Sequence, residues 1–189
     1  MRKIGIITTT ICLFVSLAGA QVPTSGNVFV GYSFENAGSS ALNLNLSRPN
    51  LQGWEASLEG KVLPAMGIVA DFSGHYGSES YTPESLGPIP GPIIPVNVTG
   101  HEEEVLFGPR FSFSVRKFRP FAEFEFGVAH INTNDFGSST SFAFTTSGGL
   151  DYRLNRLVAW RFEGGPVWTR FFHTSQGNVR LSTGIVFRF

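Results

Sequence analysis

The stretch NVRLSTGIVFRF, residues 178–189, decides the fold of this chain. Taken at every second position, its side chains are mostly bulky and apolar: Val179, Leu181, Thr183, Ile185, Phe187 and Phe189. The positions between them carry Arg180, Ser182 and Arg188. Because successive side chains of a β-strand point to opposite faces, this alternation predicts a strand with one apolar and one polar face.

Seven further segments alternate in the same way. The predicted strands are residues 27–34, 52–63, 67–76, 103–115, 120–131, 141–154 and 157–172. Pro109 and Pro166 interrupt two of them, and we interpret Pro109 as a bulge because proline is disfavoured inside a sheet. Short turns alternate with longer loops between the strands. These features predict an all-β fold, an eight-stranded antiparallel up-and-down transmembrane β-barrel with a closed lumen.

The N-terminus reads as a secretory signal peptide over residues 1–20, with a basic start, an apolar run and the ending Ala18-Gly19-Ala20. The apolar run is shorter than the roughly 20 residues of a spanning helix, which disfavours a membrane anchor. The expected barrel domain is therefore residues 21–189. Cys12 lies in the signal, so this domain has no cysteine for a disulfide or thiol site. Its formal charge of −2 (12 basic against 14 acidic residues) gives no indication of a nucleic-acid partner.

The volume of the apolar face predicts which way it points. Roughly two dozen bulky side chains cannot fit inside eight strands, so we expect them to face lipid, whereas a soluble sandwich would be overpacked. Charged side chains on the other face then pair across the lumen, because an unmatched buried charge is costly. This predicted ion-pair lattice comprises Glu55, Glu59, Lys61, Asp71, Glu104, Arg110, Glu123, Glu125, Asp151, Arg153, Arg161, Glu163, Arg180 and Arg188.

Several motifs resemble those of a known family. The strand ending at Phe189 looks like the C-terminal targeting strand of bacterial outer-membrane barrels, with Phe189 as the membrane-insertion residue. VADFSGHYG (69–77), FGPRFSF (107–113), FGVAH (126–130) and GGLDYRLN (148–155) resemble OmpA-like eight-stranded barrels of the small, acidobacterial type. The resemblance implies the cell outer membrane, contact with its lipids and lipopolysaccharide, insertion by the barrel-assembly machinery, and an extracellular ligand of the loops. It does not extend to a peptidoglycan-binding domain after Phe189.

The expected function is a structural or surface-interaction role in adhesion or envelope integrity, without enzymatic chemistry or a cofactor. Two alternatives stay open: a narrow ion-conducting pore and a lipid A-modifying enzyme. His173-Thr174-Ser175 resembles the His-x-Ser of the outer-membrane lipid A deacylases, in which a Glu lies on the following strand. Residues 178–189 contain no Asp or Glu, so a triad would lack its orienting acid and we expect no catalytic residues.

Two features near the predicted outer rim have weaker signals. His75, His101 and His130 lack the spacing of a metal site, so we expect ordinary rim hydrogen bonds and no bound metal. The loop 77–102 contains five prolines among isoleucines and valines, which favours a stiff, extended segment. That segment either contacts a partner or folds over the barrel mouth.

Overall fold

The computed structural model describes residues 25–36, 50–81, 96–134, 137–171 and 175–189. For residues 79–81, 96–98 and 176 the description is limited to the backbone. The predicted signal peptide, residues 1–20, lies outside the described residues.

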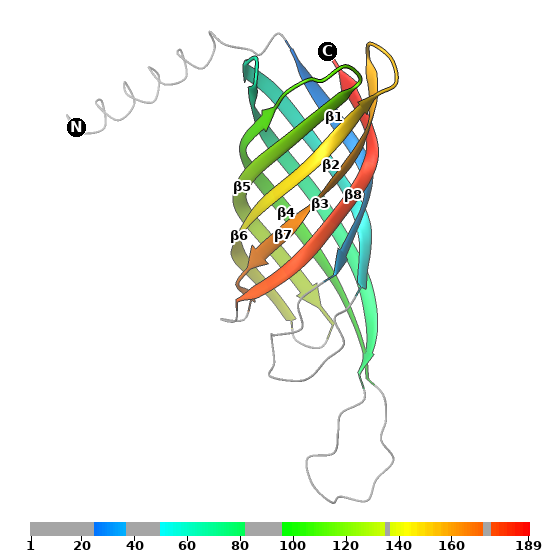
Figure 1. Cartoon of the computed structure of the whole chain (residues 1–189). Helices are drawn as coiled ribbons and strands as arrows, with labels where there is room; N and C mark the ends of the chain where they lie inside the picture. The colour runs from blue at the N-terminus through cyan, green and yellow to red at the C-terminus, as the bar shows by residue number, and fades with distance from the viewer. Residues whose placement is uncertain (1–24, 37–49, 82–95, 135–136, 172–174) are drawn as a thin grey trace, which may run out of the picture.

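Eight strands form one closed antiparallel barrel, as the sequence predicted (Figure 1). The strands are β1 (Gly26–Asn36), β2 (Asn50–Leu63), β3 (Met66–Tyr81), β4 (Val96–Ser112), β5 (Phe118–Thr133), β6 (Gly137–Arg153), β7 (Val158–Thr169) and β8 (Gln176–Arg188). Each strand pairs with the next one in sequence, and β8 pairs with β1 to close the ring. Among the described residues, no helix is both long and apolar enough to cross a membrane.

The two ends of the barrel differ. The connections β2–β3, β4–β5 and β6–β7 meet at the end drawn uppermost in Figure 1, which we call the turn end. The opposite ends of the strands lie at what we call the loop end. At the turn end, Gly26 and Phe189 exchange two backbone hydrogen bonds of 3.0 and 3.1 Å. The last residue of the chain is thereby joined to the first strand.

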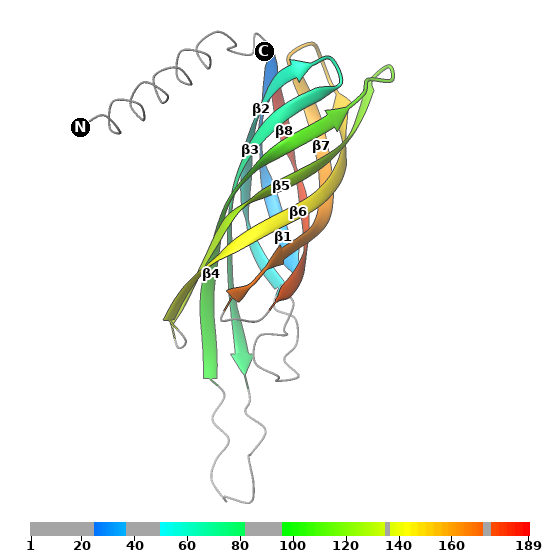
Figure 2. The same cartoon turned by 90° about the vertical axis from the view of Figure 1, so that its left-hand side faces the viewer.

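Several strands extend further at the loop end than their alternation predicted. β3 continues to Tyr81 and β4 begins at Val96, and the two remain paired from Gly77–Gly100 to Tyr81–Val96. Their hairpin therefore projects beyond the other strands (Figure 2). In this part of β3 and β4 the sequence no longer alternates between apolar and polar residues, although the backbone pairing continues. The central part of the predicted proline-rich loop, residues 82–95, lies outside the described residues.

The two prolines interrupt the ladder without changing its register, so the predicted bulge at Pro109 is wrong. Phe107 pairs with Phe126 and Arg110 with Glu123, three residues further along both strands. The ladder around Pro166 likewise resumes in the same register. A glycine precedes each proline; a Cβ on Gly108 would lie 1.9 Å from the carbonyl oxygen of Phe124. The close backbone approach, and not an inserted residue, accommodates the missing N–H donor.

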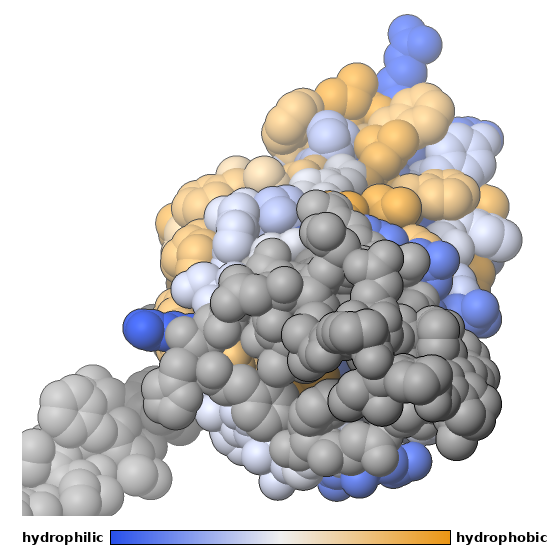
Figure 3. Space-filling view, turned by 90° about the horizontal axis from the view of Figure 1, so that it is seen from below, coloured by the Kyte–Doolittle hydropathy of each residue, from blue (hydrophilic) through white to orange (hydrophobic). Residues whose placement is uncertain are grey.

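The apolar face points outward. Phe124, Trp160 and Phe187 are 45%, 42% and 52% exposed, and apolar side chains cover the flank of the barrel in Figure 3. Aromatic pairs cross this surface, such as Phe107 on Phe126 with ring centroids 4.4 Å apart. A surface of this extent suits an apolar solvent, because soluble proteins rarely expose such contiguous apolar patches.

Candidate functional site

Polar and charged side chains make up most of the buried interior of the barrel, beside smaller apolar clusters that include Phe29, Leu106 and Phe171. Ten carboxylates are buried there: Glu35, Glu55, Glu59, Asp71, Glu102, Glu104, Glu123, Glu125, Asp151 and Glu163. Six cationic side chains form ion pairs with members of this set: Lys61, Arg110, Arg119, Arg161, Arg180 and Arg188. Within the described part of the chain, acids therefore outnumber these cations by four.

Five of the six cations belong to one group, which we call the turn-end network. Its members are Lys61, Arg110, Arg119, Arg161 and Arg188 with Glu59, Glu123, Asp151 and Glu163. The Phe121 ring contacts two guanidinium groups of this network, with its centroid 4.5 Å from Arg110 Cζ and 4.6 Å from Arg161 Cζ. The centroid of the Phe29 ring lies 5.0 Å from Arg161 Cζ. This part of the lumen is filled by paired charges and aromatic rings.

The sixth cation, Arg180, is the only arginine or lysine among the described residues that forms ion pairs in the rest of the lumen. Its Nη1 lies 3.0 Å from Glu104 Oε2 and 3.2 Å from Asp71 Oδ1, and its Nε lies 3.7 Å from Glu55 Oε2. Neither oxygen of Glu125 has a hydrogen-bond partner, and Glu102 Oε1 also lacks one. The negative charge of the lumen is therefore concentrated away from the turn end.

The structure places thirteen of the fourteen predicted lattice residues in the lumen or at its turn-end mouth. Arg153 is the exception, and its assignment to the lattice is wrong. Its side chain is exposed and donates a 3.0 Å hydrogen bond to the carbonyl oxygen of Arg116. The strand ends there, so alternation no longer determines the direction of the side chain. Arg119, which the sequence placed in a turn, lies over the lumen instead and contacts Glu59 at 3.2 Å.

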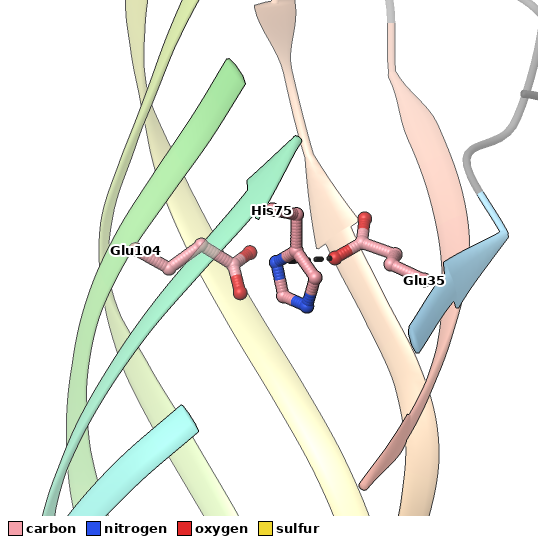
Figure 4. Close-up of side chains that lie close together, drawn as sticks. All are labelled: Glu35, His75 and Glu104. Atoms are coloured by element: carbon pink, nitrogen blue, oxygen red, sulfur yellow. Dashed lines mark ion pairs between the residues drawn. The ribbon is translucent and has the colours of Figure 1, made fainter. Parts of the chain in front are cut away.

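The three histidines occupy different environments, and the rim position predicted for His75 is wrong. His75 is 0% exposed inside the lumen, where it lies between the carboxylates of Glu35 and Glu104 (Figure 4). His101 stacks with Tyr76, with ring centroids 6.1 Å apart. His130 Nδ1 forms a 2.7 Å hydrogen bond with Thr140 Oγ1. Sequence reasoning missed Glu35 and Glu102 because both were assigned to loops.

One group around His75 has the order of a hydrolase triad. Ser33 Oγ lies 2.8 Å from His75 Nε2, and His75 Nδ1 lies 3.4 Å from Glu35 Oε2. All three residues are 0% exposed, and the outward face of the barrel is separated from them by the sheet itself. An ester in the surrounding lipid cannot reach Ser33. Triad-like geometry alone therefore does not assign catalysis here.

A second serine is accessible instead. Ser175 is exposed and lies one residue before β8, at the loop end. Continuing the alternation of β8 back from Gly177 puts Ser175 on the outward side. The Trp168 ring lies over Gly177, since a Cβ on that glycine would be 3.7 Å from Trp168 Cδ1, and it stacks on Phe144 with centroids 4.7 Å apart. The neighbouring His173 lies outside the described residues.

Comparison with known protein families identifies this chain. The model of a family described as lipid A 3-O-deacylase (PagL) matches residues 42–183, which include both His173 and Ser175. The chain belongs to the PagL family. No curated protein matches it in sequence. The match corrects the expectation that the chain is not an enzyme, because the family is one of enzymes. His173 and Ser175, set aside because no acid follows them, thus become the candidate catalytic residues.

Solved structures agree on the fold. Neisserial surface protein A has a TM-score of 0.63 and 12% identity, covering 87% of this chain and 97% of its own. The attachment invasion locus protein Ail of Yersinia pestis has a TM-score of 0.57 and 13% identity, covering 89% and 100%. OprG of Pseudomonas aeruginosa has a TM-score of 0.51 and 8% identity, covering 87% and 95%. This PagL-family protein is a small eight-stranded barrel of the cell outer membrane, as predicted.

Proposed function

We propose that the protein hydrolyses an acyl ester of lipid A in the outer leaflet, with Ser175 as nucleophile and His173 as general base. The family match over residues 42–183 carries this proposal. Outer-membrane barrels keep short turns at the periplasmic side, so the loop end, with Ser175, faces outward where lipopolysaccharide lies. The aromatic surface of Trp168 and Phe144 beside Ser175 is suited to contact an acyl chain.

The chemistry is acyl transfer in two steps. Ser175 Oγ attacks the ester carbonyl while His173 accepts the hydroxyl proton, and the sugar hydroxyl leaves with that proton. Water then hydrolyses the acyl-serine and releases the fatty acid. An alkoxide forms poorly without a base, so loss of either residue should abolish turnover.

Among the described residues, Glu103 is the only carboxylate on the outer surface, because the other ten are buried in the lumen. Glu103 is on β4, four strands from β8, which is roughly 19 Å around the barrel at about 4.8 Å per strand. It is too distant to orient His173. Glu84 and Asp135 lie outside the described residues, as does the side chain of Glu79.

The proposal is tested by measuring, with mass spectrometry, the lipid A of Gram-negative cells that express the protein. The wild type should release one hydroxyacyl chain, and Ser175→Ala and His173→Ala should not. Ser33→Ala is the matched control, because it removes a serine hydroxyl from the sealed triad-like group. Loss of activity in Ser33→Ala with retention in Ser175→Ala would move the reaction to the lumen. Unchanged lipid A with the folded wild type would contradict the proposal and favour the surface-interaction role expected from the sequence.

A further inference from the structure

The loop-end part of the lumen holds more negative charge than its own cations balance. Four of the ten buried carboxylates share the five cations of the turn-end network. Of the other six, Glu55, Asp71 and Glu104 pair with Arg180, and no arginine or lysine among the described residues forms an ion pair with Glu35, Glu102 or Glu125. Burying unpaired carboxylates is costly, so the carboxyl groups of this region either take up protons or attract further positive charge.

Three of its side chains converge on one point. Glu35, His75 and Glu104 come from β1, β3 and β4, and their potential ligand atoms all lie within 4.8 Å of one another. All three residues are at most 1% exposed. Each has one atom without a hydrogen-bond partner, namely Glu35 Oε2, His75 Nδ1 and Glu104 Oε1. Figure 4 shows the imidazole ring between the two carboxylates.

We propose that Glu35, His75 and Glu104 bind a divalent transition-metal ion such as Zn²⁺ inside the lumen. One imidazole nitrogen with carboxylate oxygens suits this class of ion, whereas Mg²⁺ and Ca²⁺ prefer oxygen ligands alone. Tetrahedral ligands about 2.0–2.2 Å from a zinc ion lie roughly 3.3–3.6 Å from one another, so donor atoms as much as 4.8 Å apart must approach by about an ångström or more when the ion binds. An ion placed there supplies the positive charge that the region lacks.

The surroundings of His75 fit the role of a ligand. Its Nε2 forms a 2.8 Å hydrogen bond with Ser33 Oγ, and in the tautomer in which Nε2 is the donor, the lone pair of Nδ1 faces the carboxylate of Glu35 at 3.4 Å. Metal-bound histidines characteristically donate their other ring N–H in this way, which fixes the tautomer and the ring orientation. Glu102 pairs with His75 across β3 and β4 and has an unpartnered Oε1, but it is not among the residues whose ligand atoms lie within 4.8 Å of one another.

This site is separate from the proposed hydrolytic site, and its test does not depend on enzyme activity. The full chain, folded in detergent micelles and stripped with a chelator, is incubated with Zn²⁺ and desalted, and its metal content is measured. We expect one tightly bound equivalent for the wild type, and at least about a tenfold loss of affinity for His75→Gln and Glu104→Gln. His130→Gln is the matched control, since His130 binds Thr140 outside the lumen.

Two further measurements keep the test decisive if a variant folds poorly. Heat-dependent gel mobility identifies the closed barrel in each sample, and only folded protein is compared. Zn²⁺ should raise the unfolding temperature of the wild type and of His130→Gln, and leave that of His75→Gln unchanged. A folded wild type that retains no zinc, or equal retention by His75→Gln and Glu104→Gln, would overturn the proposal.

Discussion

The guanidinium of Arg180 on β8 lies 3.0 Å from the carboxylate of Glu104 on β4. Three strands lie between β8 and β4 in either direction around the barrel, so this pair joins opposite walls across the lumen. The same Nη1 reaches Asp71 at 3.2 Å. A single arginine thus crosslinks the part of the interior in which carboxylates are most concentrated.

Replacing Arg180 by Met should lower the free energy of unfolding by about 3–5 kcal/mol, because it leaves buried carboxylates without their cation. Arg153→Met is the control: that side chain is exposed and bonds a backbone carbonyl, so its loss should cost less than about 0.5 kcal/mol. Denaturant unfolding in detergent, followed by tryptophan fluorescence, measures both. Equal losses for the two variants would show that the transluminal pair adds nothing.

A positive charge on the outer surface should be costly in proportion to its depth in the bilayer. Phe126→Arg, within β5, should lower stability by about 2–4 kcal/mol if the position lies near the middle of the membrane. Phe118→Arg, at the turn-end start of the same strand, should cost about 0–1 kcal/mol. Unfolding from lipid vesicles compares them. A smaller loss for Phe126→Arg than for Phe118→Arg would contradict the assigned lipid face.

Trp168 should matter for activity more than Trp160, although both lie on the outer side of β7. Trp168 lies over Gly177, two residues from Ser175, and stacks on Phe144. Its replacement by Ala should reduce deacylation by between about threefold and tenfold, in line with about 0.5–1.5 kcal/mol for an aromatic contact. Trp160→Ala removes a ring near the turn end and should leave the rate unchanged. Equal rates in a lipid A hydrolysis assay would remove Trp168 from the acyl-binding surface.

The lumen should not conduct ions steadily in a planar bilayer, which bears on the pore alternative. Phe121, with the guanidinium groups of Arg110 and Arg161 both within 4.6 Å of its ring centroid, lies in the turn-end network. Eight strands enclose only enough space for their own side chains. Arg161→Ala removes one guanidinium from this plug and should allow intermittent openings. Steady openings of the wild type that change in Arg161→Ala would favour the pore.

Alternation in the sequence predicted strand number, antiparallel order and the direction of the apolar face. It succeeded because each strand crosses a boundary between lipid and a polar interior, which imposes a period of two. It failed at the loop end, where β1, β3 and β4 continue as paired backbone after the contrast between faces has faded. His75, Glu35 and Glu102 were assigned to the rim or to loops for that reason.

The partners of the lumenal charges could not be read from the chain. Arg180 and Glu104 are 76 residues apart, and their meeting depends on the stagger of the strands around the closed barrel. Inward-facing aromatic residues such as Phe29 and Phe121 also escaped prediction, because polar neighbours at the same faces concealed them. The enzyme family was missed because the motif His173-x-Ser175 lacks an acid on β8, and no pattern in the sequence indicates which residue replaces it.

The seam between β1 and β8 constrains how the protein reaches its membrane. Ser33 and Ser182 face each other across it, although 149 residues separate them in the chain. Ring closure must therefore wait until β8 has come to lie beside β1. Before that moment, every insertion intermediate has two open edges whose N–H and C=O groups find no water among acyl chains. An assembly factor that capped those edges would remove this barrier to biogenesis.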